Sequence, residues 1–88
     1  MDSAATPRVL LELLKARVKI LELQRLEIKE QKDNLTQAID NGELSGVKTE
    51  MLLDLYDGLK GTLDEIIKQT NASTERTDDF LREVEQGQ

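Results

Sequence analysis

The segment from Val9 to Ile28 carries apolar residues at helical spacing on more sides than one neighbouring helix can cover. One stripe comprises Val9, Leu13, Ala16, Ile20 and Leu23, and a second comprises Leu10, Leu14, Leu21 and Ile28. Leu11, Val18 and Leu26 lie outside both stripes. Such a helix needs at least two neighbours, and a chain of 88 residues supplies one. We therefore expect an interface with another chain, formed by Val9, Leu13, Ala16, Ile20, Leu23 and Leu26.

The same helix shows alternate steps of four and three that are typical of a coiled-coil seam. This predicted seam consists of Leu14, Val18, Leu21, Arg25, Ile28, Lys32, Leu35 and Ile39. Thr6 is a candidate N-cap, with Pro7 at the first helical position. Gly42 suits the left-handed conformation that follows many helix ends. The prediction is a flexible tail over residues 1–6 and a helix over 7–41.

A second seam follows the glycine-flanked turn expected at residues 42–46, where Ser45 is a candidate N-cap. It consists of Leu52, Tyr56, Leu59, Leu63, Ile66, Thr70, Ser73, Thr77, Phe80 and Val84. Residues 70–74 are short and polar and favour a loop by propensity, so two helices with a break there are the alternative. The unbroken spacing favours one helix over residues 47–85.

Two helices of similar length joined by so short a turn must fold back on each other. Residues 8–40 carry seven basic and six acidic residues, whereas residues 43–88 carry five basic and eleven acidic ones, so the pairing also suits the charges. The predicted fold is therefore an all-α, antiparallel two-helix hairpin of the coiled-coil type, forming a single domain over residues 7–86. The uncovered stripe further predicts assembly into a bundle of four or more helices.

Four seam or near-seam residues leave alternatives open. Arg25 and Lys32 either set the register from buried positions or extend their charged ends to solvent with only the stems buried. Gly58 and Gly61 each cost about 1 kcal/mol within a helix relative to alanine. They either permit the close approach of another backbone or are simply tolerated at the surface.

The composition lacks residue types on which several classes of protein function depend. The chain has no cysteine and no histidine, so we expect no disulfide, no metal site, no cofactor and no enzymatic activity. A net charge of −6 and only 2% aromatic residues argue against nucleic-acid binding. The longest apolar run is three residues, Val9 to Leu11, which predicts neither a membrane span nor a signal peptide. A cytoplasmic location is the resulting expectation.

Two functions fit these features. The first is an assembly or scaffold subunit that associates with itself or with another helical protein through its apolar helix faces. The second is a small acidic chaperone or regulatory binder, which would capture an amphipathic helix or mask a basic surface of its partner. In both cases the partner is a protein.

Overall fold

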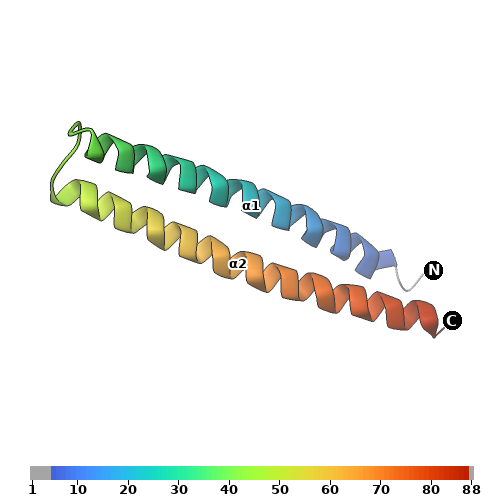
Figure 1. Cartoon of the computed structure of the whole chain (residues 1–88). Coiled ribbons are helices and arrows are strands. Elements are labelled where there is room, and N and C mark those ends of the chain that lie inside the picture. Colours follow the sequence, from blue (N-terminus) through green and yellow to red (C-terminus); the bar gives the residue numbers. More distant parts are fainter. Residues whose placement is uncertain (1–4, 88) are drawn as a thin grey trace.

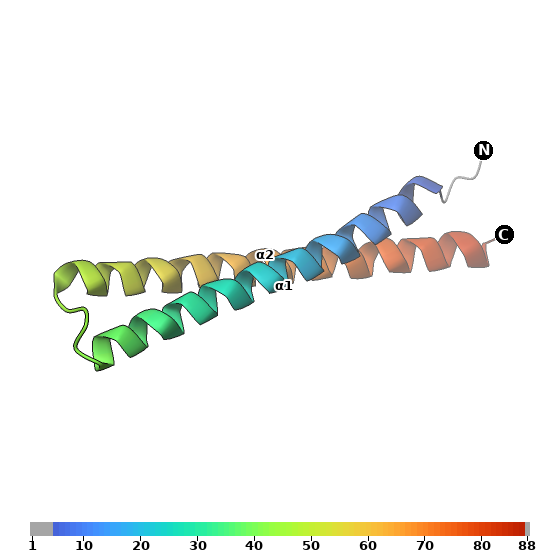
Figure 2. The same ribbon diagram turned by 90° about the horizontal axis from the view of Figure 1, so that it is seen from above.

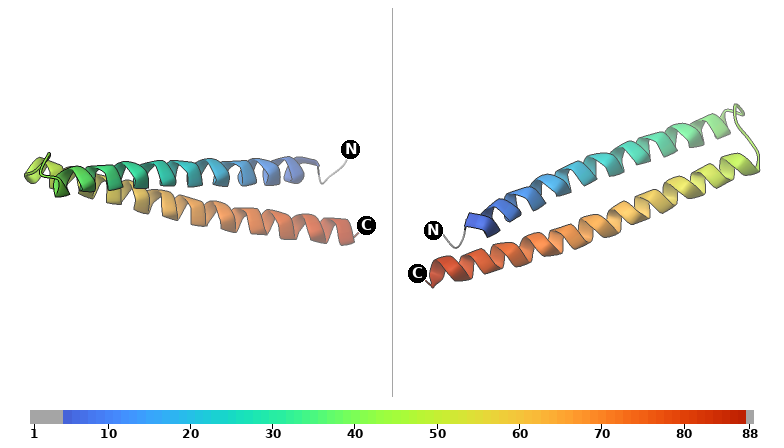
Figure 3. Two further views of the ribbon diagram at one scale, coloured as in Figure 1. Left: turned by 45° about the horizontal axis from the view of Figure 1, so that its top comes forward. Right: turned by 180° about the vertical axis from the view of Figure 1, so that it is seen from behind.

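Two long helices lie side by side and run in opposite directions in the computed structural model, which describes residues 5–87 (Figure 1). Helix α1 spans Ala5–Asp40 and helix α2 spans Val47–Gln86. The pair forms a rod of 66 × 16 × 14 Å, with the turn at one end and, at the other, open end, the start of α1 and the end of α2. The helices cross at a shallow angle (Figure 2) and stay adjacent along their length in both further views (Figure 3). The predicted antiparallel hairpin is confirmed.

Backbone hydrogen bonds at the end of α1 explain why the chain turns at Gly42. Gly42 adopts a φ of 76°, which is in the left-handed region. Its N–H donates to the carbonyl of Ile39 at 3.0 Å, and the N–H of Glu43 donates to the carbonyl of Ala38 at 2.9 Å. This pair of bonds is a Schellman motif, which satisfies carbonyls that the end of the helix leaves open.

The caps at the two helix starts differ from the sequence prediction, although α2 begins at Val47 as predicted. Helix α1 already includes Ala5, so Thr6 lies within the helix rather than at its N-cap. The remainder of the predicted tail, residues 1–4, lies outside the described residues. Helix α2 is capped by Gly46 at a φ of 103°, with no side-chain cap bond, instead of by Ser45. The amides of Thr49 and Glu50 reach the Gly46 carbonyl at 3.2 and 3.3 Å.

The apolar seam of α1 faces α2 as its spacing requires. All apolar residues of the predicted seam in this helix are buried or half-buried: Leu14, Val18, Leu21, Ile28, Leu35 and Ile39. Leu11 also belongs to this seam, because only 7% of its surface is exposed and it packs with Leu81 of α2. The signal for Leu11 was available, since it precedes Leu14 by the three residues that the repeat requires.

Helix α2 presents a face rotated by one residue from the predicted seam. The inward residues are Leu53, Tyr56, Lys60, Leu63, Ile67, Thr70, Thr74, Thr77, Leu81 and Val84. The predicted seam instead contained Leu52, Leu59 and Phe80, which are 38, 43 and 50% exposed. It also contained Ser73, which is exposed. Ile66 is half-buried at the margin of the seam. Every seventh residue from Tyr56 to Val84 belongs to both the predicted seam and the observed seam.

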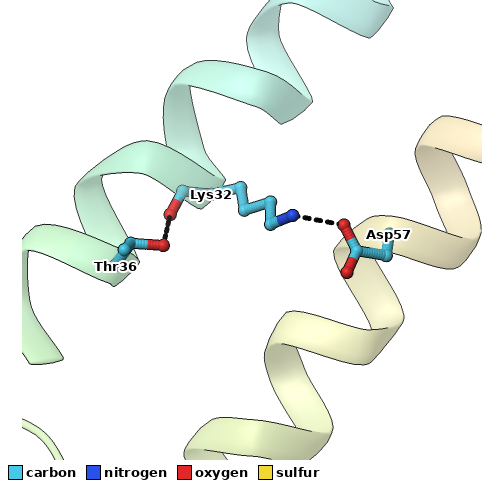
Figure 4. A network of polar contacts seen from close by, with 3 residues as sticks. All are labelled: Lys32, Thr36 and Asp57. Atoms are coloured by element: carbon cyan, nitrogen blue, oxygen red, sulfur yellow. Dashed lines mark hydrogen bonds and ion pairs between the residues drawn. The ribbon is translucent and has the colours of Figure 1, made fainter.

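Ion pairs between the helices accompany this rotation. Arg25 bonds to Asp64, and Lys32 bonds to Asp57 (Figure 4). The stems of the two cations occupy seam positions, while their charged ends reach acids beside the seam. Both cations remain partly exposed, at 42 and 35% of the side chain, so they follow the alternative in which the charged ends extend outward and only the stems are buried.

The polar stretch at residues 70–77 is continuous helix. Thr70 is buried, and its hydroxyl donates to the carbonyl of Ile66 at 2.7 Å. The hydroxyls of Thr74 and Thr77 donate to the carbonyls of Thr70 and Ser73, each at 2.8 Å. Each hydroxyl is therefore satisfied by the carbonyl four residues earlier, which allows polar residues to line the seam without breaking the helix.

Replacing Thr70 with Val is expected to raise the free energy of unfolding by about 1 kcal/mol. The substitution keeps the side-chain shape, removes a bond to a carbonyl that the helix already satisfies, and adds apolar contact at a buried position. Thermal unfolding followed by circular dichroism would show a midpoint about 4 to 8 °C higher. Asn71→Val, at an exposed neighbouring position, is the control and should change the midpoint little; a lower midpoint for Thr70→Val would contradict this account.

Candidate interaction surface

The seam of α2 has two edges of opposite character. Asp57, Asp64, Asp78 and Glu85 recur at multiples of seven residues and line one edge. Leu52, Leu59, Ile66 and Phe80 also recur at multiples of seven residues and line the other edge. Residues seven apart lie on the same side of a coiled-coil helix. One side of the hairpin is therefore acidic along α2, and the other is apolar.

The acidic edge of α2 faces basic residues of α1. Besides the pairs made by Arg25 and Lys32, Arg8 bonds to Glu85 at 2.5 Å. A shallow hollow on this side is lined by Lys15, Glu22, Asn71 and others. The ion pairs are solvent-exposed, so each contributes about 0 to 1 kcal/mol and mainly orients the helices. We call this side the charged edge.

The opposite side of the hairpin carries seven of the thirteen exposed large apolar side chains. Leu10 and Phe80 line one hollow there, and Arg17 and Ile66 line a second. Because residues three and four apart share a helix face, Leu13 and Ile20 lie on the same side as Arg17. We call this side the apolar edge, and it comprises Leu10, Leu13 and Ile20 of α1 with Leu52, Leu55, Leu59, Ile66 and Phe80 of α2.

The predicted interface residues of α1 all lie outside the hairpin contact. Val9, Leu13, Ile20, Leu23 and Leu26 are 60, 63, 57, 62 and 49% exposed, and Ala16 is exposed as well. Leu13 and Ile20 belong to the apolar edge. Val9, Ala16 and Leu23 lie on the back of α1, and Leu26 lies further round, where it lines a hollow with Lys19 and Glu22. Their predicted role as an interface stays a prediction.

Helix α2 adds an apolar surface that the sequence interpretation assigned to the seam or left out. Met51 and Leu55 are 65 and 56% exposed, and they line a hollow with Lys48 and Leu52 near the turn. The signal was present in the sequence, because Leu52, Leu53, Leu55 and Tyr56 provide more apolar residues than one seam can use. The structure therefore gives each helix an exposed apolar surface.

Little apolar surface is fully buried within the described hairpin. Leu11, Leu21 and Leu81 are the buried apolar residues, at 7, 8 and 5% exposure. Thirteen large apolar side chains remain exposed among the residues for which exposure is described. A two-layer domain normally buries its apolar stripes against a further element. This hairpin lacks that element within residues 5–87.

Other kinds of site were sought over the same residues. No described group of three or more acidic side chains has the arrangement needed to hold a metal ion. Neither described helix contains a stretch long and apolar enough to cross a membrane. Comparison of the chain with protein-family models, with curated protein sequences and with solved structures gave no significant match.

Proposed function

We propose that this protein is a non-enzymatic assembly module, whose hairpin joins helices of another chain through its apolar edge. The observation that carries the proposal is the division of the surface into two edges. Charged side chains of the charged edge form ion pairs within the hairpin, whereas the apolar edge has no partner there. Ion pairs and polar side chains complete one side of the rod. The other side offers Leu10, Leu13 and Ile20 with Leu52, Leu55 and Leu59, and half-exposed Phe80 extends it.

The amount of exposed apolar surface supports this proposal. Contiguous apolar patches of several hundred Å² on small proteins commonly mark interaction sites. Leucine and isoleucine side chains that become fully buried contribute about 1.5 to 3 kcal/mol each. Several such residues along one side of a rod would therefore suffice for stable packing into a bundle of four or more helices.

Replacing Leu13 and Ile20 together with Glu is expected to abolish association while leaving the hairpin folded. Both side chains are more than half exposed, at 63 and 57%, so the hairpin itself loses little packing. Burying two carboxylates in an apolar contact would raise the dissociation constant at least about 100-fold. Light scattering would show the mass falling to that of the 10.0 kDa chain, with the helical circular dichroism retained.

A matched control is available on the same helix. Thr36→Glu with Gln37→Glu adds the same charge at two exposed positions of α1 that face away from the apolar edge. This variant should keep the mass of the parent chain. If both double variants have the parent mass, the apolar edge is not the surface of association and the proposal is wrong.

A further inference from the structure

We infer that the occupant of the apolar edge is a second copy of this chain, docked antiparallel about a two-fold axis at the middle of the rod. The inference rests on the proposed function and names its partner. Three observations carry it: the placement of the exposed leucines, the distribution of charge, and the area that the hairpin leaves uncovered. The product is a four-helix bundle in which the turn of each copy lies over the open end of the other.

Most residues of the apolar edge occupy the first half of their helix. In α1 they are Leu10, Leu13 and Ile20, and in α2 they are Leu52, Leu55 and Leu59, followed by Ile66 at the middle and Phe80 beyond it. Because the helices are antiparallel, these two groups lie at opposite ends of the rod (Figure 1). Leu13 lies about ten residues before the middle of α1, and Leu55 about twelve before the middle of α2, roughly 15 and 18 Å.

A two-fold axis across the rod exchanges these two ends. It brings the open-end apolar group of one copy to the same end of the bundle as the turn-end apolar group of the other, and does so twice in one closed dimer. A parallel arrangement would instead place each apolar group at the same end as its own counterpart. The similar distances of Leu13 and Leu55 from the middle of the rod allow the two different groups to share each half of the antiparallel bundle.

The charges of the two ends favour the same arrangement. Residues 26–66, which form the turn half, carry ten acidic and four basic side chains. Residues 5–25 and 67–86, which form the open half, carry seven acidic and eight basic ones. A parallel dimer would stack one strongly acidic half on another. The antiparallel dimer places each acidic half against a half that is slightly basic, which reduces the repulsion between like charges.

The uncovered area matches what such a dimer needs. The chain exposes 6819 Å², whereas a compact folded monomer of 10.0 kDa is expected to expose about 5,200 Å². The excess is about 1,600 Å², and a stable interface typically buries about 800 Å² of each partner. The excess is about twice the area that one further copy typically covers, so the hairpin has enough uncovered surface for a stable dimer.

Two variants, Gln24→Cys and Gln31→Cys, test the antiparallel arrangement of the dimer. Each has a single cysteine, because the parent chain contains none. Both glutamines are exposed and lie one heptad apart on the apolar-edge side of α1, so they form a matched pair. Gln24 is close to the middle of the helix and meets its own counterpart across the two-fold axis. Gln31 is about 21 Å further from its counterpart, because each copy adds seven residues at 1.5 Å.

The readout is cross-linking of each variant with a short thiol-reactive reagent, resolved on a denaturing gel. We expect Gln24→Cys to form at least about ten times more covalent dimer than Gln31→Cys. Equal yields from both variants, or none from either, would overturn the antiparallel arrangement. If the parent chain is then still oligomeric and loses mass with the Leu13 and Ile20 substitutions, the assembly function stands and only this geometry fails.

Discussion

Replacing Leu81 with Ala is expected to lower the free energy of unfolding by about 2 to 3 kcal/mol. Leu81 is the least exposed residue of the described hairpin core, at 5%, and it packs with Leu11 and Val84. Few other apolar side chains are buried, so this loss is a large share of the total stability. Thermal unfolding at low protein concentration would show a midpoint lower by about 8 to 24 °C.

Phe80 is the matched control for Leu81, because it is the adjacent residue and is 50% exposed. Phe80→Ala should cost less than about 1 kcal/mol in the isolated hairpin, although it removes the larger side chain. The two variants therefore measure which face of α2 turns toward α1. A larger loss of stability for Phe80→Ala than for Leu81→Ala would restore the seam predicted from the sequence and contradict the observed rotation.

Replacing both Gly58 and Gly61 with Ala is expected to raise the free energy of unfolding by about 2 kcal/mol. Both glycines lie inside α2, and a Cβ built on either meets nothing within 4 Å. Each alanine reduces the backbone freedom of the unfolded chain and favours the helix by about 1 kcal/mol. The unfolding midpoint should rise by about 8 to 16 °C.

Replacing Gly42 with Ala is expected to have the opposite effect on stability to the Gly58 and Gly61 substitutions. The φ of 76° at Gly42 is a conformation that alanine adopts at a cost of about 1 to 2 kcal/mol, so Gly42→Ala should destabilise the hairpin. The same chemical change thus has opposite signs at the turn and inside α2. If the alanines at Gly58 and Gly61 reduce the mass of the assembly, another backbone lies against the back of α2, which the antiparallel dimer does not place there.

The hairpin and the α1 seam could be predicted from the sequence because both follow from periodicity. The repeat from Leu14 to Ile39 has one register, since the second half of α1 offers no competing apolar stripe. Gly42 marked the turn because its conformation excludes most other residues. These features depend on local sequence alone.

The face of α2 could not be predicted in the same way. Leu52 and Leu53, Ile66 and Ile67, and Phe80 and Leu81 are adjacent apolar pairs, so two seams with the same spacing were available. The observed choice brings Asp57 and Asp64 to Lys32 and Arg25, and such contacts between helices are not visible in a local pattern. For the same reason the apolar edge, which spans both helices, became visible only in the structure.

The mass of the unmodified chain across a dilution series tests most directly whether the apolar edge is covered by a second copy. Light scattering is expected to give twice the 10.0 kDa chain mass at high micromolar concentration, with full helical circular dichroism. On dilution, the mass should fall toward that of one chain while the helical signal is retained, because the hairpin stays folded when the apolar edge becomes uncovered. A mass of 10.0 kDa at every concentration, with undiminished helix and cooperative unfolding, would contradict the account.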